Sequence, residues 1–192
     1  MELKRDDALA LMQEYTEHIN LRRHMYAVEA AMRAYARKFN EDDNLWSITG
    51  LLHDFDYERW PNTEHRADDG HPANGVAILQ EKGYPEEVCR AILGHAYYTG
   101  VPRETLLAKT LYAVDELTGF ITACALVRPN GISDMKVKSV KKKLKDPAFA
   151  RGVNREDVTK GAAELDVELG EHIQFVIDAM REIQDELGLG GR

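Results

Sequence analysis

LWSITGLLHD, residues 45–54, is the stretch that decides the fold of this chain. Its apolar positions recur at the three- and four-residue spacing of an amphipathic helix: Leu45, Ile48 and Leu52. The stretch ends on two adjacent metal-ligand types, His53 and Asp54. A charged group near an apolar core is costly unless it is paired or bound to a cation. The pair therefore predicts a metal site built between helices.

The helical period continues on both sides of this stretch. An apolar face over residues 21–39 precedes it, and Asn40 is expected to cap the helix that follows. Further helices are predicted, with Pro72 as the first helical residue of one of them. They cover residues 72–82, about 88–95, 104–127, 133–145 and a final stretch that ends near Leu187. No strand alternation or repeat stands out, so the fold class predicted is all-α, a helical bundle with a C-terminal helical extension.

Length and spacing predict how the chain is organised. Its 192 residues are expected to form a single domain over 1–192. Within it we expect a core with the metal site over 21–127 and a helical extension over 133–187. The glycine-rich tail over 188–192 is expected to be frayed.

Composition narrows the function classes. A net charge of −8 argues against duplex nucleic acid as a partner. Cys89 and Cys124 lie far apart without a CxxC spacing, which suits a reducing compartment. The N-terminus lacks the apolar run of a signal peptide, and the longest apolar run, Phe120–Val127, is too short to cross a bilayer. A cytoplasmic protein without a membrane partner is therefore expected.

Four further residues of ligand type lie at helix ends or on predicted core faces. His24 is four residues before Val28, His95 shares the face of Ile92, Asp115 follows Leu111 by four, and His71 immediately precedes the helix that starts at Pro72. Inward side chains from separate helices are how a bundle builds a metal site. The other histidines, His18 and His172, are interpreted as ordinary surface residues.

The order of these residues resembles the HD superfamily of metal-dependent phosphohydrolases, in its extended two-metal version. The resemblance covers roughly Leu21 to Leu126 and rests on the ligand-type residues in family order: His24, His53, Asp54, His71, His95 and Asp115. It implies a first metal bound by His24, His53, Asp54 and Asp115. It implies a second bound by Asp54, His71 and His95, with Asp54 bridging the two.

The resemblance also implies an activity, hydrolysis of a small phosphorylated substrate, for instance a nucleotide, by a metal-bound hydroxide. Imidazole and carboxylate ligands favour one or two ions of manganese, iron, cobalt, nickel or zinc over magnesium or calcium. Such an ion lowers the pKa of bound water toward 7, and a second ion clamps the phosphoryl oxygens. Asp54 is thus expected at the catalytic centre, and Asp56 as an orienting group or an acid toward the leaving group.

Basic and loop residues supply candidates for substrate contact: Arg23, Lys109 and His65. Surface solvation is the more common fate of such residues. Lysines crowd the segment Lys136–Lys145, where a solvated helix face is favoured over a rim that attracts anions. Asp56 and Tyr57 stand where cyclic-dinucleotide phosphodiesterases of the superfamily carry glycine and lysine, which argues against that substrate.

Two other functions stay open on the sequence. Some HD-fold proteins with this ligand pattern hold two irons and act as oxygenases, and ligand types alone do not separate the two chemistries. A non-catalytic metal- or nucleotide-binding module ranks third. The C-terminal helix is also apolar enough to pack either on its own bundle or on a second subunit in a homodimer.

Overall fold

A computed structural model describes residues 3–191, and within this range it contains helices and no strands. This confirms the all-α class. The chain divides into two compact units, Met1–Leu111 and Tyr112–Arg192, and α6 (Leu106–Leu126) begins in the first and continues into the second. The single-domain organisation expected from the length stays a prediction. In the described part of the chain, no helix has the length and apolarity that crossing a membrane requires.

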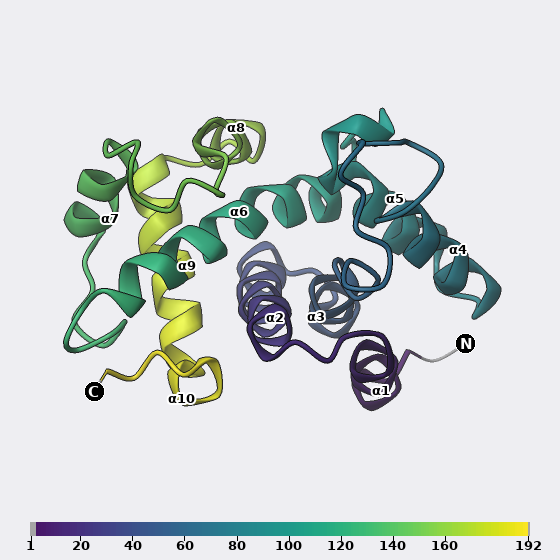
Figure 1. Cartoon of the computed structure of the whole chain (residues 1–192), viewed down its shortest axis with the longest axis horizontal. Helices are drawn as coiled ribbons and strands as arrows, with labels where there is room; N and C mark the ends of the chain where they lie inside the picture. The colour runs from purple at the N-terminus through teal and green to yellow at the C-terminus, as the bar shows by residue number, and fades with distance from the viewer. Residues whose placement is uncertain (1–2, 192) are drawn as a thin grey trace. The chain divides into compact units, whose positions relative to one another are not determined.

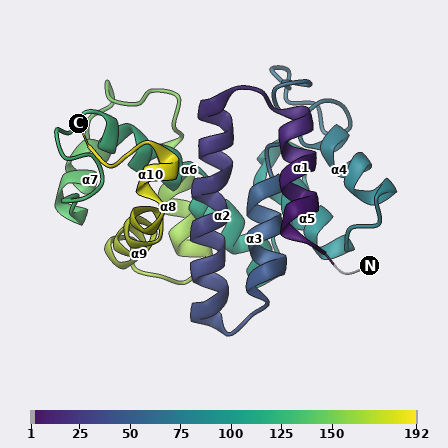
Figure 2. The ribbon, with the colours of Figure 1, turned by 90° about the horizontal axis from the view of Figure 1, so that it is seen from below.

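The first unit places three helices side by side. α3 packs against α2 on one side and α1 on the other, as Figure 2 shows, and α5 contacts both α3 and α4. The helices of this unit that precede α6 are α1 (Arg5–Tyr15), α2 (Ile19–Phe39), α3 (Asp43–Leu52), α4 (Ala73–Glu81), α5 (Glu86–His95) and the 3₁₀ turn η1 (Tyr97–Thr99).

The contact between α2 and α3 is close because a glycine faces the partner helix. A Cβ atom on Gly50 would lie 3.0 Å from the backbone of Glu29. Glu29 is only 3% exposed, and its carboxylate accepts from Arg5 Nη2 at 2.9 Å and Arg33 Nη2 at 2.6 Å. Two arginines therefore compensate the buried charge. The close packing sets the α2 and α3 backbones at the spacing on which the histidines of the site depend.

Two predicted helix starts differ from the structure by a few residues. Asn40 does not cap α3: it ends α2 in a left-handed conformation at φ 58°, which asparagine tolerates better than most residues. Asp42 is the cap instead, and its carboxylate accepts from the backbone N–H groups of Asn44 and Leu45. Pro72 lies just outside α4, after a cis peptide bond from His71.

The second unit consists of the rest of α6 and four further helices. α9 packs against both α7 and α8, an arrangement visible in Figure 1. The predicted final helix is broken at Ile183, so that a short α10 follows α9. The helices after α6 are α7 (Val137–Leu144), α8 (Arg155–Glu164), α9 (Leu169–Glu182) and α10 (Gln184–Leu187).

Two expectations for this unit are corrected. His172 was predicted on the surface, but it is 1% exposed and its Nε2 lies 2.9 Å from the carbonyl oxygen of Ala113. It sits four residues before Val176 and thus belongs to the buried face of α9. The tail is anchored at Leu189, which is 3% exposed and accepts a hydrogen bond from Ile132 N–H. Arg192 lies outside the described residues.

Candidate metal centre

Two histidines of the site stand at the ends of helices and are oriented by carbonyl groups of their own chain. His53 follows the last residue of α3, and its Nδ1 lies 2.8 Å from the carbonyl oxygen of Gly50. His95 ends α5, and its Nδ1 contacts the carbonyl oxygen of Ile92. Because a carbonyl oxygen only accepts, each Nδ1 carries the proton. Each ring therefore turns Nε2, its other nitrogen, toward the Asp54 carboxylate, and the lone pair of that nitrogen is the one that could bind a metal.

A buried carboxylate orients a third histidine. His71 Nδ1 donates to Asp56 Oδ1 at 2.7 Å, and Asp56 Oδ2 accepts from Gly75 N–H at 2.7 Å. Asp56 is 1% exposed, so both of its oxygens are occupied away from solvent. A carboxylate behind a ligand histidine fixes the tautomer and strengthens the ligand. This geometry suits the orienting role expected for Asp56 and gives no support to its role as an acid toward a leaving group.

Asp54 lies between two pairs of histidines and turns one oxygen toward each pair. Its Oδ1 lies 3.3 Å from His71 Nε2 and 3.5 Å from His95 Nε2. Its Oδ2 lies 3.4 Å from His53 Nε2 and 3.7 Å from His24 Nε2. All five residues belong to the first unit. The carboxylate is thus placed to bridge two neighbouring ions.

The distances within each histidine pair fit a bound cation. His71 Nε2 lies 3.3 Å from His95 Nε2, and His53 Nε2 lies 3.3 Å from His24 Nε2. Two nitrogen lone pairs that face each other repel unless a proton or a cation lies between them. Ligand atoms about 2.0–2.2 Å from one ion, at tetrahedral or octahedral angles, are separated by about 2.8–3.6 Å. Asp54, His71 and His95 can accordingly offer one ligand atom each to a single ion.

Burial and neighbouring charges shift the pKa values of Asp54 and His71 in opposite directions. Burial alone would raise the pKa of Asp54, but His53, His95 and His71 outweigh it and hold that pKa well below its ordinary value. Burial alone would lower the pKa of His71, but the hydrogen bond that His71 donates to Asp56 and the charges of Asp54 and Asp56 raise it. The site is therefore strongly polarised, with an ionised carboxylate held among imidazoles.

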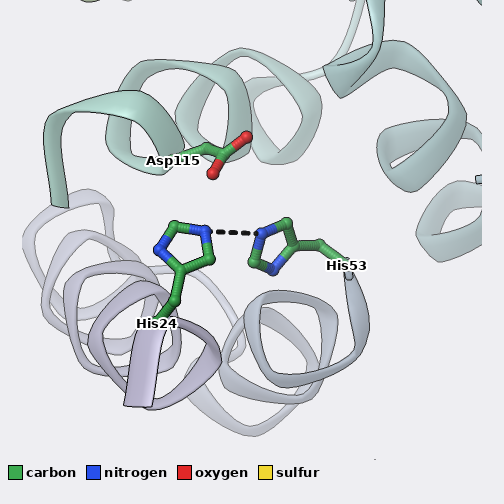
Figure 3. Close-up of side chains that lie close together, drawn as sticks. All are labelled: His24, His53 and Asp115. Carbon is green, nitrogen blue, oxygen red and sulfur yellow. Dashed lines mark hydrogen bonds between the residues drawn. The ribbon is translucent and has the colours of Figure 1, made fainter. Parts of the chain in front are cut away.

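Figure 3 shows the rings of His24 and His53 with the short contact between their Nε2 atoms. The two rings meet edge to face, with centroids 5.1 Å apart. Asp115, the third residue drawn, comes from α6 and from the part of that helix that belongs to the second unit. Of the residues predicted as ligands, five therefore converge within the first unit.

For two of the residues predicted to contact the substrate, Arg23 and Lys109, the structure gives a position but, within the described part of the chain, no hydrogen bond or ion pair with the proposed ligands. Arg23 precedes His24 on α2, and its buried Nε has no hydrogen-bond acceptor among the described residues. Its neighbour Arg22 instead donates to the carbonyl oxygens of Thr16 and Gln13. Lys109 is half-buried near the start of α6. These two placements leave substrate contact a prediction.

His65 is exposed and contacts two tyrosines. Its Nδ1 lies 2.8 Å from Tyr97 Oη, and its ring stacks on that of Tyr98 with centroids 4.8 Å apart. Tyr98 Oη in turn donates to the carbonyl oxygen of His71 at 3.0 Å. Tyr98 was not among the predicted site residues. The signal for it was its position three residues after His95, in the 3₁₀ turn η1 that follows α5.

A family model described as the HD domain matches residues 21–119 of the chain. That span includes every residue predicted as a metal ligand. No curated protein and no solved structure matches the chain.

Proposed function

The chain belongs to the HD domain family, and with it to the superfamily of metal-dependent phosphohydrolases, and from this premise we propose that it hydrolyses a small phosphorylated molecule. The observation that carries the proposal is the position of Asp54, whose two oxygens each face a histidine pair at 3.3–3.7 Å. A divalent metal is the partner that such a donor set fits.

The proposed ligand sets follow this geometry. Asp54, His71 and His95 would hold one ion. The other would be held by His24, His53 and the second oxygen of Asp54. We assign Asp115 to this ion as well, because the HD domain match includes it and it stands at the aspartate that follows the histidines in the family order of ligands. Two such ions, when bound, would activate a water molecule at neutral pH and carry positive charge to the phosphoryl oxygens.

In this proposal the remaining candidate residues either orient a ligand or contact the substrate. Asp56 keeps the proton of His71 on Nδ1, so that Nε2 stays available. Arg23, with an unpartnered Nε one residue from His24, is the nearest candidate in sequence for a phosphate contact. His65 and Lys109 are retained as weaker candidates for substrate contact. A nucleotide and a sugar phosphate are both compatible with these roles.

The proposal is tested by phosphatase assays with a panel of phosphomonoesters, on the metal-free protein and after addition of Mn²⁺. We expect activity that depends on the metal and that falls by at least about a hundredfold in His95→Ala, since that variant removes a ligand. His18→Ala is the matched control, because His18 is exposed and caps α2 without a side-chain hydrogen bond. Equal activity of His95→Ala and His18→Ala would refute the assignment.

A further inference from the structure

A hollow in the unit formed by residues 112–192 belongs to none of the features described so far. It has a volume of about 230 Å³ and opens between the end of α6, the segment that follows it and α7. Three basic side chains line it, Arg128, Lys142 and Lys143, together with the hydroxyl group of Ser139. Asp146 is the one acidic side chain in its lining. In a chain with a net charge of −8 this is a local reversal of charge.

The basic groups of this hollow are only partly neutralised by the protein. Arg128 Nη2 donates to Asp134 at 2.7 Å, but Arg128 Nε is buried and has no acceptor in the part of the chain that is described. Lys143 lies over the ring of Phe149, 4.3 Å from its centroid. Lys142 has no ion-pair partner among residues 3–191. A buried N–H without an acceptor costs free energy that a bound acceptor would recover.

The lysines of α7 repel one another, and a bound anion would relieve this repulsion. α7 has eight residues, of which four are lysines and none is acidic. Lysines three and four residues apart on one helix repel each other. Of these four lysines, only Lys141 has an ion pair in the described chain, with Glu168 at 3.2 Å. This cluster was interpreted from the sequence as a solvated helix face. In the structure two of its members, Lys142 and Lys143, line the hollow.

We propose that this hollow binds a phosphate group, supplied by a small free anion or by the phosphate end of a larger molecule. The guanidinium group of Arg128 and the ammonium group of Lys142 both line the hollow, and a phosphate group between them would accept charge-assisted hydrogen bonds from both. The volume lies below the roughly 300–1,000 Å³ of pockets for drug-sized ligands, so the hollow has room for a phosphate group but not for a whole drug-sized ligand. The proposal does not depend on the phosphohydrolase activity, since none of these residues belongs to the metal centre.

The test is calorimetric titration of the full-length protein with inorganic pyrophosphate, and with ATP, in the absence of divalent metal. We expect binding that weakens as salt is added and that falls about tenfold in Lys142→Ala. Lys145→Ala is the matched control: it removes the same charge at the end of the same helix, outside the hollow, and is expected to change affinity less than about twofold. Tighter binding of ATP than of pyrophosphate would identify a nucleotide as the source of the phosphate.

Other outcomes would overturn the assignment. They are no binding of either anion by the wild-type protein, equal losses in Lys142→Ala and Lys145→Ala, or a loss in Asp54→Asn in place of Lys142→Ala. Arg128→Gln provides a second variant, which should also weaken binding while circular dichroism shows an unchanged helix content. Binding of polyglutamate as tight as that of pyrophosphate would point to an acidic peptide and would also refute a phosphate site.

Discussion

Asp56 Oδ1 lies 2.7 Å from His71 Nδ1, so a buried carboxylate orients one of the proposed metal ligands from behind. The carboxylate is buried and also accepts from the backbone of Gly75, so it is held in place from two sides. It fixes the proton on Nδ1 and directs Nε2 toward Asp54 and His95. The site therefore includes a supporting layer as well as its ligands.

Replacement of the Asp56 carboxylate should lower the affinity of the protein for one ion and leave its affinity for the other unchanged. In Asp56→Asn we expect the affinity for one divalent ion to fall by about 10–100-fold, because the amide orients His71 less firmly and makes it a poorer ligand. The other ion should bind as in the wild type, since His24 and His53 do not contact Asp56. Calorimetric titration with Mn²⁺ resolves the two sites. An equal loss of affinity at both sites, or no loss at either site, would show that Asp56 does not act through His71.

The Asp56 carboxylate occupies space that is free only because residue 75 is a glycine. A Cβ atom at Gly75 would lie 2.6 Å from Asp56 Cγ. Gly75→Ala should therefore lower the free energy of unfolding by about 1–3 kcal/mol and weaken metal binding together with it. The control is Gly119→Ala, also within a helix, where an added Cβ meets no atom within 4 Å. That variant should be neutral or stabilising by up to about 1 kcal/mol, measured by urea unfolding in the presence of chelator.

The raised pKa of His71 predicts opposite pH trends for the metal-free and metal-bound protein. A raised pKa contributes stability below the ordinary value of 6.5, and this contribution is lost as the pH rises through the raised value. Metal binding needs the neutral ring, so its stabilising effect should grow over the same interval. Melting temperatures at pH 6, 7 and 8, with chelator and with Mn²⁺, measure both trends.

Asp56→Asn serves as the control for this pH effect, because it removes the hydrogen bond that raises the pKa of His71. The variant should show a flatter decline of the metal-free melting temperature than the wild type. A metal-induced increase in melting temperature that stays constant from pH 6 to pH 8 would contradict the account.

The helical class was predicted correctly, and five of the six candidate ligands lie together in the first unit, because both features depend on patterns local to each helix. Their role as metal ligands stays a prediction. Apolar spacing places His53 at the inner end of α3, and no distant contact is needed to infer it. The interpretation of His172 as a surface residue was wrong, since its burial depends on α9 packing with the Ala113 carbonyl 59 positions away in the chain. The role of Asp56 was stated as two alternatives, and only its distance to His71 favours one of them.

Other details also depended on contacts that local patterns do not encode. Asn40 has the chemistry both of a helix start and of a left-handed helix end, and the chain uses it for the second. The carboxylate of Asp54 could face one ion or two, and the choice follows from how α2, α3 and α5 pack. The hollow beside α7 was not foreseen, because a run of lysines does not reveal the cavity next to it.

The most direct test is the number of divalent ions held per chain by the full-length protein and by Asp54→Asn, measured by elemental analysis after dialysis against limiting Mn²⁺, Fe²⁺, Ni²⁺ or Zn²⁺. The account predicts two ions in the wild type and the loss of both, or of all but a weakly held one, when the bridging carboxylate is replaced. Retention of two ions by Asp54→Asn, or no ion in the wild type, would contradict a centre organised around Asp54.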